Sequence, residues 1–262
     1  MKRLIVHLSD LHFGRIDPAT LDPLVESIRE MRPDLIAVSG DLTQRARRTE
    51  FEQARDFLKR LPLPQIVVPG NHDIPLYNPC LRFISKWSRF REYIDPEPEQ
   101  SYVDEAMAVI GVNTSRALTW KGGRISGRQI ESVRSLFCSV GKAVLKVLVV
   151  HHPIDIPFGW SPGMKALRAR RALGQWADCG VDMILAGHAH RALASGDVNS
   201  FQIGHHHAVI VQAGTATSTR GRGELNSFNA IHVDQDQILV VRETWNAAAN
   251  RFEATHEDAF NR

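Results

Sequence analysis

Short apolar runs alternate with amphipathic segments along the first third of the chain. The runs 3–8, 35–38 and 66–68 are apolar enough to predict buried strands. Between them, 21–31 and 49–61 carry apolar residues at helical spacing, and each ends just before a proline or an arginine–proline pair. This strand–helix–strand order predicts parallel strands in one sheet, with helices packed on its faces.

The rest of the chain is expected to build more sheet. A short antiparallel pair is predicted at 102–103 and 107–112, and a helix at 125–140. Later strands without helices between them predict a second, mostly antiparallel sheet, and they lie around 209–212, 229–233 and 238–245. The whole pattern predicts an α/β fold: a four-layer αββα sandwich of two mixed sheets flanked by helices.

Length and charge set broad limits on organisation and partners. A chain of 262 residues without a repeat or low-complexity linker is expected to form one domain over residues 1–262, with a lid or insert around 75–100. Its apolar content of 43% and charged content of 23% are typical of soluble proteins. The net charge of +3 is scattered, so we expect a small anionic substrate and no nucleic acid.

The N-terminus and the cysteines indicate a compartment. No apolar run approaches the roughly 20 residues that cross a bilayer, and cleavage of a signal peptide would remove the motif that begins at Ser9. Cys80, Cys138 and Cys179 are odd in number and widely spread, which argues against a disulfide framework. We therefore expect a reducing cytoplasm, with the cysteines as buried apolar residues. The pattern leaves the oligomeric state open.

Potential metal ligands lie in five short motifs, each just after an apolar run. The motifs are Ser9-Asp10-Leu11-His12, Gly40-Asp41, Gly70-Asn71-His72-Asp73, His151-His152-Pro153 and Gly187-His188-Ala189-His190. Imidazole, carboxylate and amide groups without thiolate suit Mn²⁺, Fe²⁺ or Zn²⁺. The candidate ligands are too many for one ion and fit two ions that share a bridge; they are Asp10, His12, Asp41, Asn71, His151, His188 and His190. Two ions about 3.5–4 Å apart can clamp a phosphoryl group during in-line displacement.

The spacing of the motifs predicts that they meet. Asp10 and Asp41 are 31 positions apart, Asp41 and Asn71 are 30 apart, and His151 and His188 are 37 apart. Each interval is close to the ~30 residues of one βαβ unit. Because parallel strands point the same way, each ligand group should lie at the carboxyl edge of the sheet, where α/β sheets bind their ligands.

The motifs differ in strength when each is taken alone, and Gly70-Asn71-His72-Asp73 is the more specific one. An Asp-x-His after a strand is usually a turn with a capping aspartate, and Gly-Asp is weaker still. On extended backbone, Asp10 and His12 would alternate and face the same way, as would His188 and His190. The ordered set at βαβ spacing is what predicts a common site.

The Gly-Asn-His-Asp motif predicts a catalytic acid. The amide oxygen of Asn71 can complete a metal shell, which leaves His72 beside the ions and free to give a proton to the leaving oxygen. Asp73 is expected to hold the His72 ring in its donor tautomer. We expect Asn71, His72 and His152 to contact the substrate.

These motifs resemble the D-x-H, GD, GNH[DE], H and GH-x-H pattern of the calcineurin-like metallophosphoesterase superfamily, over residues from Leu4 to about Leu193. The resemblance implies two divalent ions, the first held by Asp10, His12 and His190. It implies that Asn71, His151 and His188 hold the second, that Asp41 bridges both, and that His72 is the acid. Of the doublet, His151 is preferred as the ligand because it directly follows the run 148–150, and His152 then faces the substrate or lies behind the metal ligands.

Three segments further resemble bacterial cyclic-nucleotide phosphodiesterases, at 111–115, 151–153 and 213–216. This resemblance implies hydrolysis of a small phosphodiester such as a 3′,5′-cyclic nucleotide by a hydroxide that bridges the ions, with His72 protonating the leaving group.

Two alternatives remain open. One is a pyrophosphatase acting on a nucleotide-linked lipid such as UDP-diacylglucosamine, whose mark would be an apolar acyl channel under the lid near Phe83, Ile84 and Trp87. The other is a non-catalytic scaffold on the same fold, whose mark would be lost ligands. The run 205–207, three adjacent histidines, is expected to be a solvated loop or strand start, because neighbours on a strand face opposite ways.

Overall fold

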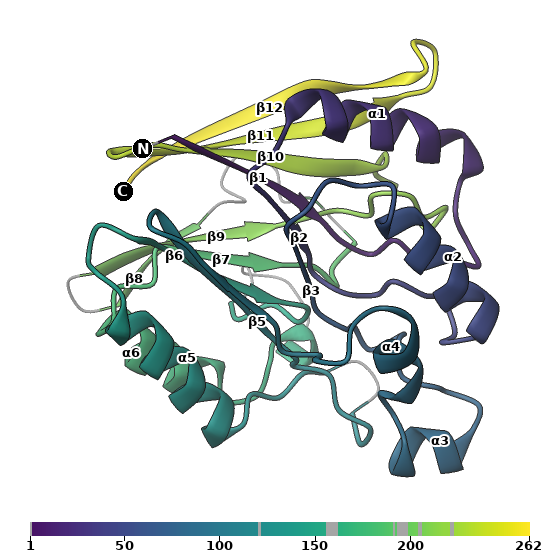
Figure 1. Cartoon of the computed structure of the whole chain (residues 1–262), viewed down its shortest axis with the longest axis horizontal. Coiled ribbons are helices and arrows are strands. Elements are labelled where there is room, and N and C mark those ends of the chain that lie inside the picture. Colours follow the sequence, from purple (N-terminus) through teal and green to yellow (C-terminus); the bar gives the residue numbers. More distant parts are fainter. Residues whose placement is uncertain are drawn as a thin grey trace.

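The computed structural model describes residues 2–119, 122–155, 162–190, 192, 199–203, 206–220 and 223–262. Two six-stranded sheets stack against each other, and helices cover the outer face of each sheet (Figure 1). The predicted four-layer α/β sandwich of two mixed sheets is therefore confirmed.

The first sheet has the strand order β12-β11-β10-β1-β2-β3. Its parallel strands are β1 (Arg3–Leu8), β2 (Leu35–Val38) and β3 (Gln65–Val67). Its antiparallel strands are β10 (Ser227–Val233), β11 (Gln237–Asn246) and β12 (Arg251–Asn261). The connections between the parallel strands contain a short 3₁₀ turn, Pro18–Thr20, and two helices, α1 (Leu21–Met31) and α2 (Arg48–Leu58).

The second sheet has the order β4-β5-β6-β7-β9-β8. Its strands are β4 (Ser101–Val103), β5 (Met107–Val112), β6 (Leu145–Val150), β7 (Met183–Ala186), β8 (Asn199–Ile203) and β9 (His206–Gln212). The strands β5, β6, β7 and β9 are parallel. The helices α5 (Gly127–Ser139) and α6 (Ala169–Ala177) cover its outer face, and Pro162–Met164 forms a 3₁₀ turn (Figure 1).

The C-terminal strands do not form a sheet of their own, so that prediction was wrong. β9 pairs in parallel with β7 in the second sheet, whereas β10 pairs antiparallel with β1 and extends the first sheet. An apolar run shows that a strand is buried but does not name its partner strand. The first sheet is mixed because the chain crosses to it after β9, whereas the second is mixed because β4 and β8 pair antiparallel with β5 and β9.

Alternate residues of the central strands enter different apolar layers, which explains their continuous apolar runs. Ile5 of β1 packs between the sheets, and its neighbour Val6 packs in the layer that contains residues of α1 and α2. In β6, Val147 lies between the sheets and Leu148 faces the layer of α5 and α6. The central strands are thus held from both sides.

The insert carries two short helices, α3 (Pro79–Ile84) and α4 (Ser88–Tyr93). Trp87 and Phe90 are buried in the same layer as α1 and α2. The buried Arg82 donates through Nε to the carbonyl of Ala117 at 2.9 Å. Phe83 and Ile84, by contrast, are 57% and 83% exposed, so they do not line an enclosed acyl channel.

The prediction about the cysteines was wrong. Cys138 at the end of α5 forms a disulfide with Cys179, which follows α6, and Cys80 is free and exposed. Only Cys179 of the three is buried. The two partners are 41 positions apart, and the pairing of their helices is a tertiary contact that cysteine spacing does not reveal.

Within the described ranges, none of the helices is both long and apolar enough to span a membrane.

Trp176 of α6 is expected to stabilise the packing of α6 against α5 on the outer face of the second sheet. Its side chain is fully buried, and its Nε1–H donates to the carbonyl of Ile130 in α5 at 3.0 Å. Replacement by Ala should lower the free energy of unfolding by about 3–5 kcal/mol through lost packing. Urea denaturation measures this loss, and Trp176→Phe, which keeps most of the ring volume, should cost clearly less. A loss below about 1 kcal/mol for the alanine variant would contradict this view of the packing.

Candidate metal centre

The five motifs follow the carboxyl ends of β1, β2, β3, β6 and β7 and come together, as the spacing predicts. Residues from opposite ends of the motif series are in contact. Nε2 of His190 lies 3.2 Å from Oδ1 of Asp10, although the two residues are 180 positions apart in the sequence. Both sheets therefore contribute to one site.

The first group of ligand atoms gathers around Asp10. Nε2 of His190 lies 3.2 Å from Oδ1 of Asp10 and also 3.2 Å from Nε2 of His12. The same nitrogen of His12 lies 3.6 Å from Oδ1 of Asp10 and 3.7 Å from Oδ2 of Asp41. Two imidazole nitrogens and two carboxylate oxygens thus converge on one small volume.

The second group gathers around Nε2 of His151. Oδ1 of Asn71 lies 3.0 Å from this nitrogen, Nδ1 of His188 lies 3.2 Å from it, and Oδ1 of Asp41 lies 3.4 Å from it. Asp41 therefore turns one oxygen to each group. This is the arrangement that a bridging carboxylate requires.

Two carboxylate oxygens without hydrogen-bond donors indicate that the site suits a cation. Oδ1 of Asp10 and Oδ2 of Asp41 are buried, and within the described ranges neither accepts a hydrogen bond. Buried polar atoms are nearly always paired, so such orphans call for a partner. With imidazole nitrogens beside them, a divalent ion such as Mn²⁺, Fe²⁺ or Zn²⁺ is the partner that this donor set suits.

Neighbouring groups orient the ligand side chains. The carbonyl of Ser39 accepts from Nδ1 of His151 at 2.8 Å, which leaves Nε2 of that ring with its lone pair toward the site. Oδ2 of Asp10 accepts from the Ser9 hydroxyl at 2.6 Å and from the His188 amide at 3.0 Å. Asp10 and His151 are thereby oriented by the protein itself.

Electrostatics favours protonation states that bind metal. Burial alone would raise the pKa of Asp41, but His151, His72 and His12 lower it to about 2. Burial lowers the pKa of His188 to about 3 and that of His190 to about 4. Ionised carboxylates and neutral imidazoles are the forms that coordinate cations. His12 differs, because burial lowers its pKa but the carboxylates of Asp10 and Asp41 outweigh burial and raise it.

The backbone at the ligands is left-handed, so the predicted extended alternation was wrong. β1 ends at Leu8 and β7 ends at Ala186, before the paired ligands begin. The positive φ angles are 52° at Asp10, 50° at His12, 52° at Asp41, 74° at His188 and 56° at His190. Tight turns, and not strand alternation, aim these side chains, and β-strand periodicity alone does not predict such turns.

His72 lies beside the site, but Asp73 does not hold its ring, so that prediction was wrong. Nδ1–H of His72 donates to the carbonyl of Gln44 at 2.9 Å. The Asp73 carboxylate instead accepts from the backbone of Leu42, Thr43 and Gly70. Burial and the charge of Asp41 raise the pKa of Asp73 to about 6. Asp73 thus shapes the loop that carries Asp41, and Gln44 orients the candidate acid.

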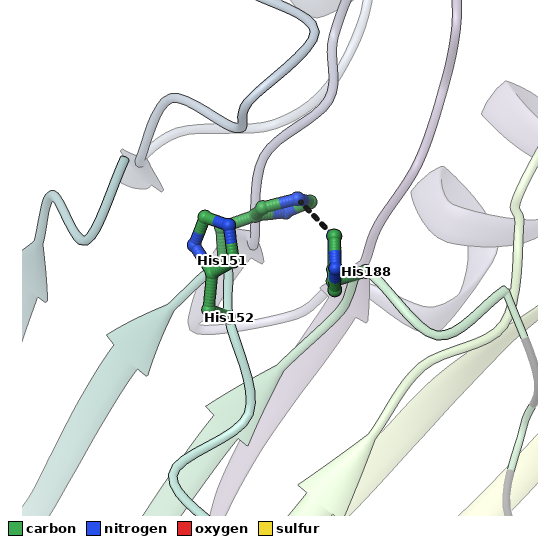
Figure 2. A group of neighbouring side chains, drawn as sticks. All are labelled: His151, His152 and His188. Carbon is green, nitrogen blue, oxygen red and sulfur yellow. Dashed lines mark hydrogen bonds between the residues drawn. The ribbon is translucent and has the colours of Figure 1, made fainter. Parts of the chain in front are cut away.

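Figure 2 shows the rings of His151, His152 and His188 gathered together, and their ligand atoms lie within 4.8 Å of one another. Nδ1 of His152 lies 2.8 Å from Oγ1 of Thr114, and its Nε2 is buried with no hydrogen-bond partner among the residues described. Burial and the neighbouring His151 hold the pKa of His152 well below its usual range. The ring is therefore neutral, and its Nε2 is free to contact a bound molecule.

Two residues that the sequence did not single out complete the surroundings of His72. They are Gln44 and Arg220, whose Nη1 lies 3.3 Å from Nε2 of His72. Gln44 follows the Gly-Asp motif by only three positions, but Arg220 lies in a loop after β9 without a motif that marks it. Of the histidine run, His205 lies outside the described residues, and His206 and His207 open β9.

A family model described as calcineurin-like phosphoesterase matches residues 3–192. A protein of Synechococcus sp. named a probable cyclic nucleotide phosphodiesterase is 26% identical over 211 residues, which cover 73% of this chain and 75% of that protein. A glycerophosphodiester phosphodiesterase of Enterobacter lignolyticus is 38% identical over 82 residues, or 27% of this chain and 29% of that protein.

The fold is also similar to that of a purple acid phosphatase from yellow lupin seeds, with a TM-score of 0.74 and 12% sequence identity. The match covers 100% of this chain, which spans only 54% of the lupin protein. Because the family model covers well over half of the sequence, the resemblance seen in the motifs is confirmed: the chain belongs to the calcineurin-like phosphoesterase family.

Proposed function

We propose that this chain hydrolyses small phosphodiesters, such as 3′,5′-cyclic nucleotides, through a dinuclear metal site. The observation that carries the proposal is the position of Asp41, whose two oxygens face two separate groups of ligand atoms. Membership of a phosphoesterase family and relatives named phosphodiesterases support the reaction class.

The ligand assignment follows the two groups. Asp10, His12 and His190 would hold one ion, Asn71, His151 and His188 would hold the other, and Asp41 would bridge them. Two divalent ions supply Lewis-acid activation of water and of the phosphate. We keep Mn, Fe and Zn as candidates, because carboxylate and imidazole donors suit each of them.

The remaining chemistry belongs to side chains beside the ligands. A proton carried at Nε2 of His72 can pass to the departing alkoxide while Nδ1–H stays bonded to the Gln44 carbonyl. His152, with an unpartnered Nε2, and the amide of Asn71 would contact the phosphate oxygens. Burial of the site keeps bulk water from weakening these contacts.

The two alternatives gain no support. All seven candidate ligands are present and converge, which disfavours a non-catalytic scaffold. The exposed Phe83 and Ile84 and the core position of Trp87 do not form the acyl channel that a nucleotide-linked lipid would need. A screen of metal-loaded protein against cyclic nucleotides, bis(4-nitrophenyl) phosphate and nucleotide-linked lipids tests the proposal. Hydrolysis of the lipid pyrophosphate alone would overturn it.

Asp41→Asn should reduce activity more than the same change at Asp10. The Asp41 carboxylate offsets the repulsion between two ions, whereas Asp10 serves one. Mutation of a residue that only orients a metal ligand lowers metal affinity or activity by about 10–100-fold, so the loss of activity in Asp41→Asn should exceed that range. Metal analysis of the purified variants should show both ions weakened by Asp41→Asn and one by Asp10→Asn. Two tightly held ions and intact activity in Asp41→Asn would refute the bridging assignment.

Substitutions in the doublet should separate metal binding from substrate binding. His151→Ala should lower metal occupancy, because its Nε2 lies between Asn71, Asp41 and His188. His152→Ala should leave occupancy largely unchanged and reduce kcat or raise KM. Metal content and steady-state kinetics of both variants decide this, and the reverse pattern would exchange the two roles.

His72→Ala should keep both ions, and its cost should depend on the leaving group. An alkyl or ribose ester should lose about 10²–10⁴-fold in kcat, because its alkoxide needs a proton. Bis(4-nitrophenyl) phosphate should lose much less, since nitrophenolate is stable as an anion. Equal losses on both substrates at unchanged metal content would mean that His72 binds the phosphate and is not the acid.

A further inference from the structure

Arg220 lies at the edge of the site, next to the candidate acid. Its Nη1 is 3.3 Å from Nε2 of His72 and 3.5 Å from Oε1 of Gln44. Its backbone N–H donates to the Ser218 hydroxyl at 3.1 Å, which shapes the loop. The side chain is half-buried, and among the described residues no carboxylate forms an ion pair with it.

The guanidinium also lies close enough to two of the metal ligands to affect their charge. Burial and the carboxylates have larger effects on the pKa of His12 and of His190, but the charge of Arg220 lowers both. Because no described carboxylate neutralises it, the guanidinium can pair with an anionic group of a ligand.

The side of the site that Arg220 occupies follows from His72. In the structure an N–H of Arg220 donates to Nε2 of His72. In the proposed reaction the same nitrogen, once protonated, gives its proton to the leaving oxygen, so Arg220 lies beside the leaving group. The nucleophile must attack from the opposite face, in line with the bond that breaks. Arg220 is thus placed to contact the alcohol that departs.

We propose that Arg220 is a specificity-determining residue that selects the charge of the leaving group; this inference rests on the proposed phosphodiesterase function. Leaving groups that carry a further negative charge are favoured. Those that carry no further charge but have oxygen acceptors are accepted, and those that carry a positive charge are disfavoured. Unit charges roughly 6 Å apart at a partly exposed site interact strongly enough to change kcat/KM about tenfold. Phosphodiesters of choline or ethanolamine should accordingly be poor substrates, and cyclic nucleotides or phosphorylated alcohols better ones.

Three methyl aryl phosphates test the inference, because in each only the aryl group leaves readily. The aryl ring carries a carboxylate, no charge or a trimethylammonium group. For each substrate the ratio of kcat/KM in wild type to that in Arg220→Gln cancels the intrinsic reactivity of the ester. We expect this ratio to be about a hundredfold larger for the carboxylate than for the ammonium substrate, with about tenfold from each charge and the neutral substrate between them. Metal content should not change.

Two controls separate charge from structure. Arg48→Gln removes the same charge from an exposed position at the start of α2, and its ratio should be equal on all three substrates. Arg220→Lys keeps the charge without the planar fork, and it should keep the wild-type order of substrates.

The possible outcomes are distinguishable. An equal ratio on all three substrates in Arg220→Gln, or an Arg220→Lys variant with the preference of Arg220→Gln, would overturn the inference and leave the proposed function intact. Wild-type protein that is loaded with metal and hydrolyses none of the three would overturn the proposed function and the inference together.

Discussion

The burial of two carboxylates, Asp10 and Asp41, is the constraint on which the site depends. Each is fully enclosed and ionised, and an uncompensated buried charge costs several kcal/mol. The surrounding imidazoles compensate only in part, because burial keeps His188 and His190 neutral at ordinary pH. Divalent cations held by the two groups of ligand atoms would balance the charge and pair the oxygens that the protein leaves without a donor. Metal binding and stability of the site are therefore coupled.

The left-handed backbone at the metal ligands is strained, and the rest of the fold must hold it in place. A non-glycine residue in this region costs about 1–2 kcal/mol, and five of the candidate ligands adopt it. Strain of this kind persists only where the surrounding structure enforces it. The strands that precede these turns are packed on both faces, which supplies the rigid support. Neighbouring glycines supply the space: a Cβ at Gly70 would collide with Asp41, and one at Gly187 would collide with the Ser9 hydroxyl.

The sequence predicted those parts of the fold that follow from the regular spacing of apolar residues and of the motifs. β1, α1 and β2 have the predicted bounds, and the ligand groups meet because parallel strands at βαβ spacing end at one edge. Contacts between elements that do not follow from βαβ spacing escaped prediction, since no local pattern encodes them. The Cys138–Cys179 disulfide and the pairing of β10 with β1 are of this kind.

The same distinction explains why Gln44 and Arg220 were missed around His72. Asp73 is adjacent to His72 and was the natural partner on sequence grounds, yet its carboxylate is saturated by backbone N–H groups. The ring turns instead to the carbonyl of Gln44, which any residue type could provide. A backbone acceptor leaves no mark in a sequence, so this partner is visible only in three dimensions.

Different parts of the molecule therefore determine the reaction class and the choice of substrate. The ligands sit on strand ends whose spacing and residue types are narrowly constrained by metal chemistry, and that is why the motifs identify a phosphoesterase. Arg220, the residue that would contact the leaving group beyond the phosphate, comes from a loop with only weak constraints on pattern. A loop can change the charge it presents without disturbing Asp10, Asp41 or the strands below them. The metal chemistry can thus stay fixed while the range of leaving groups changes.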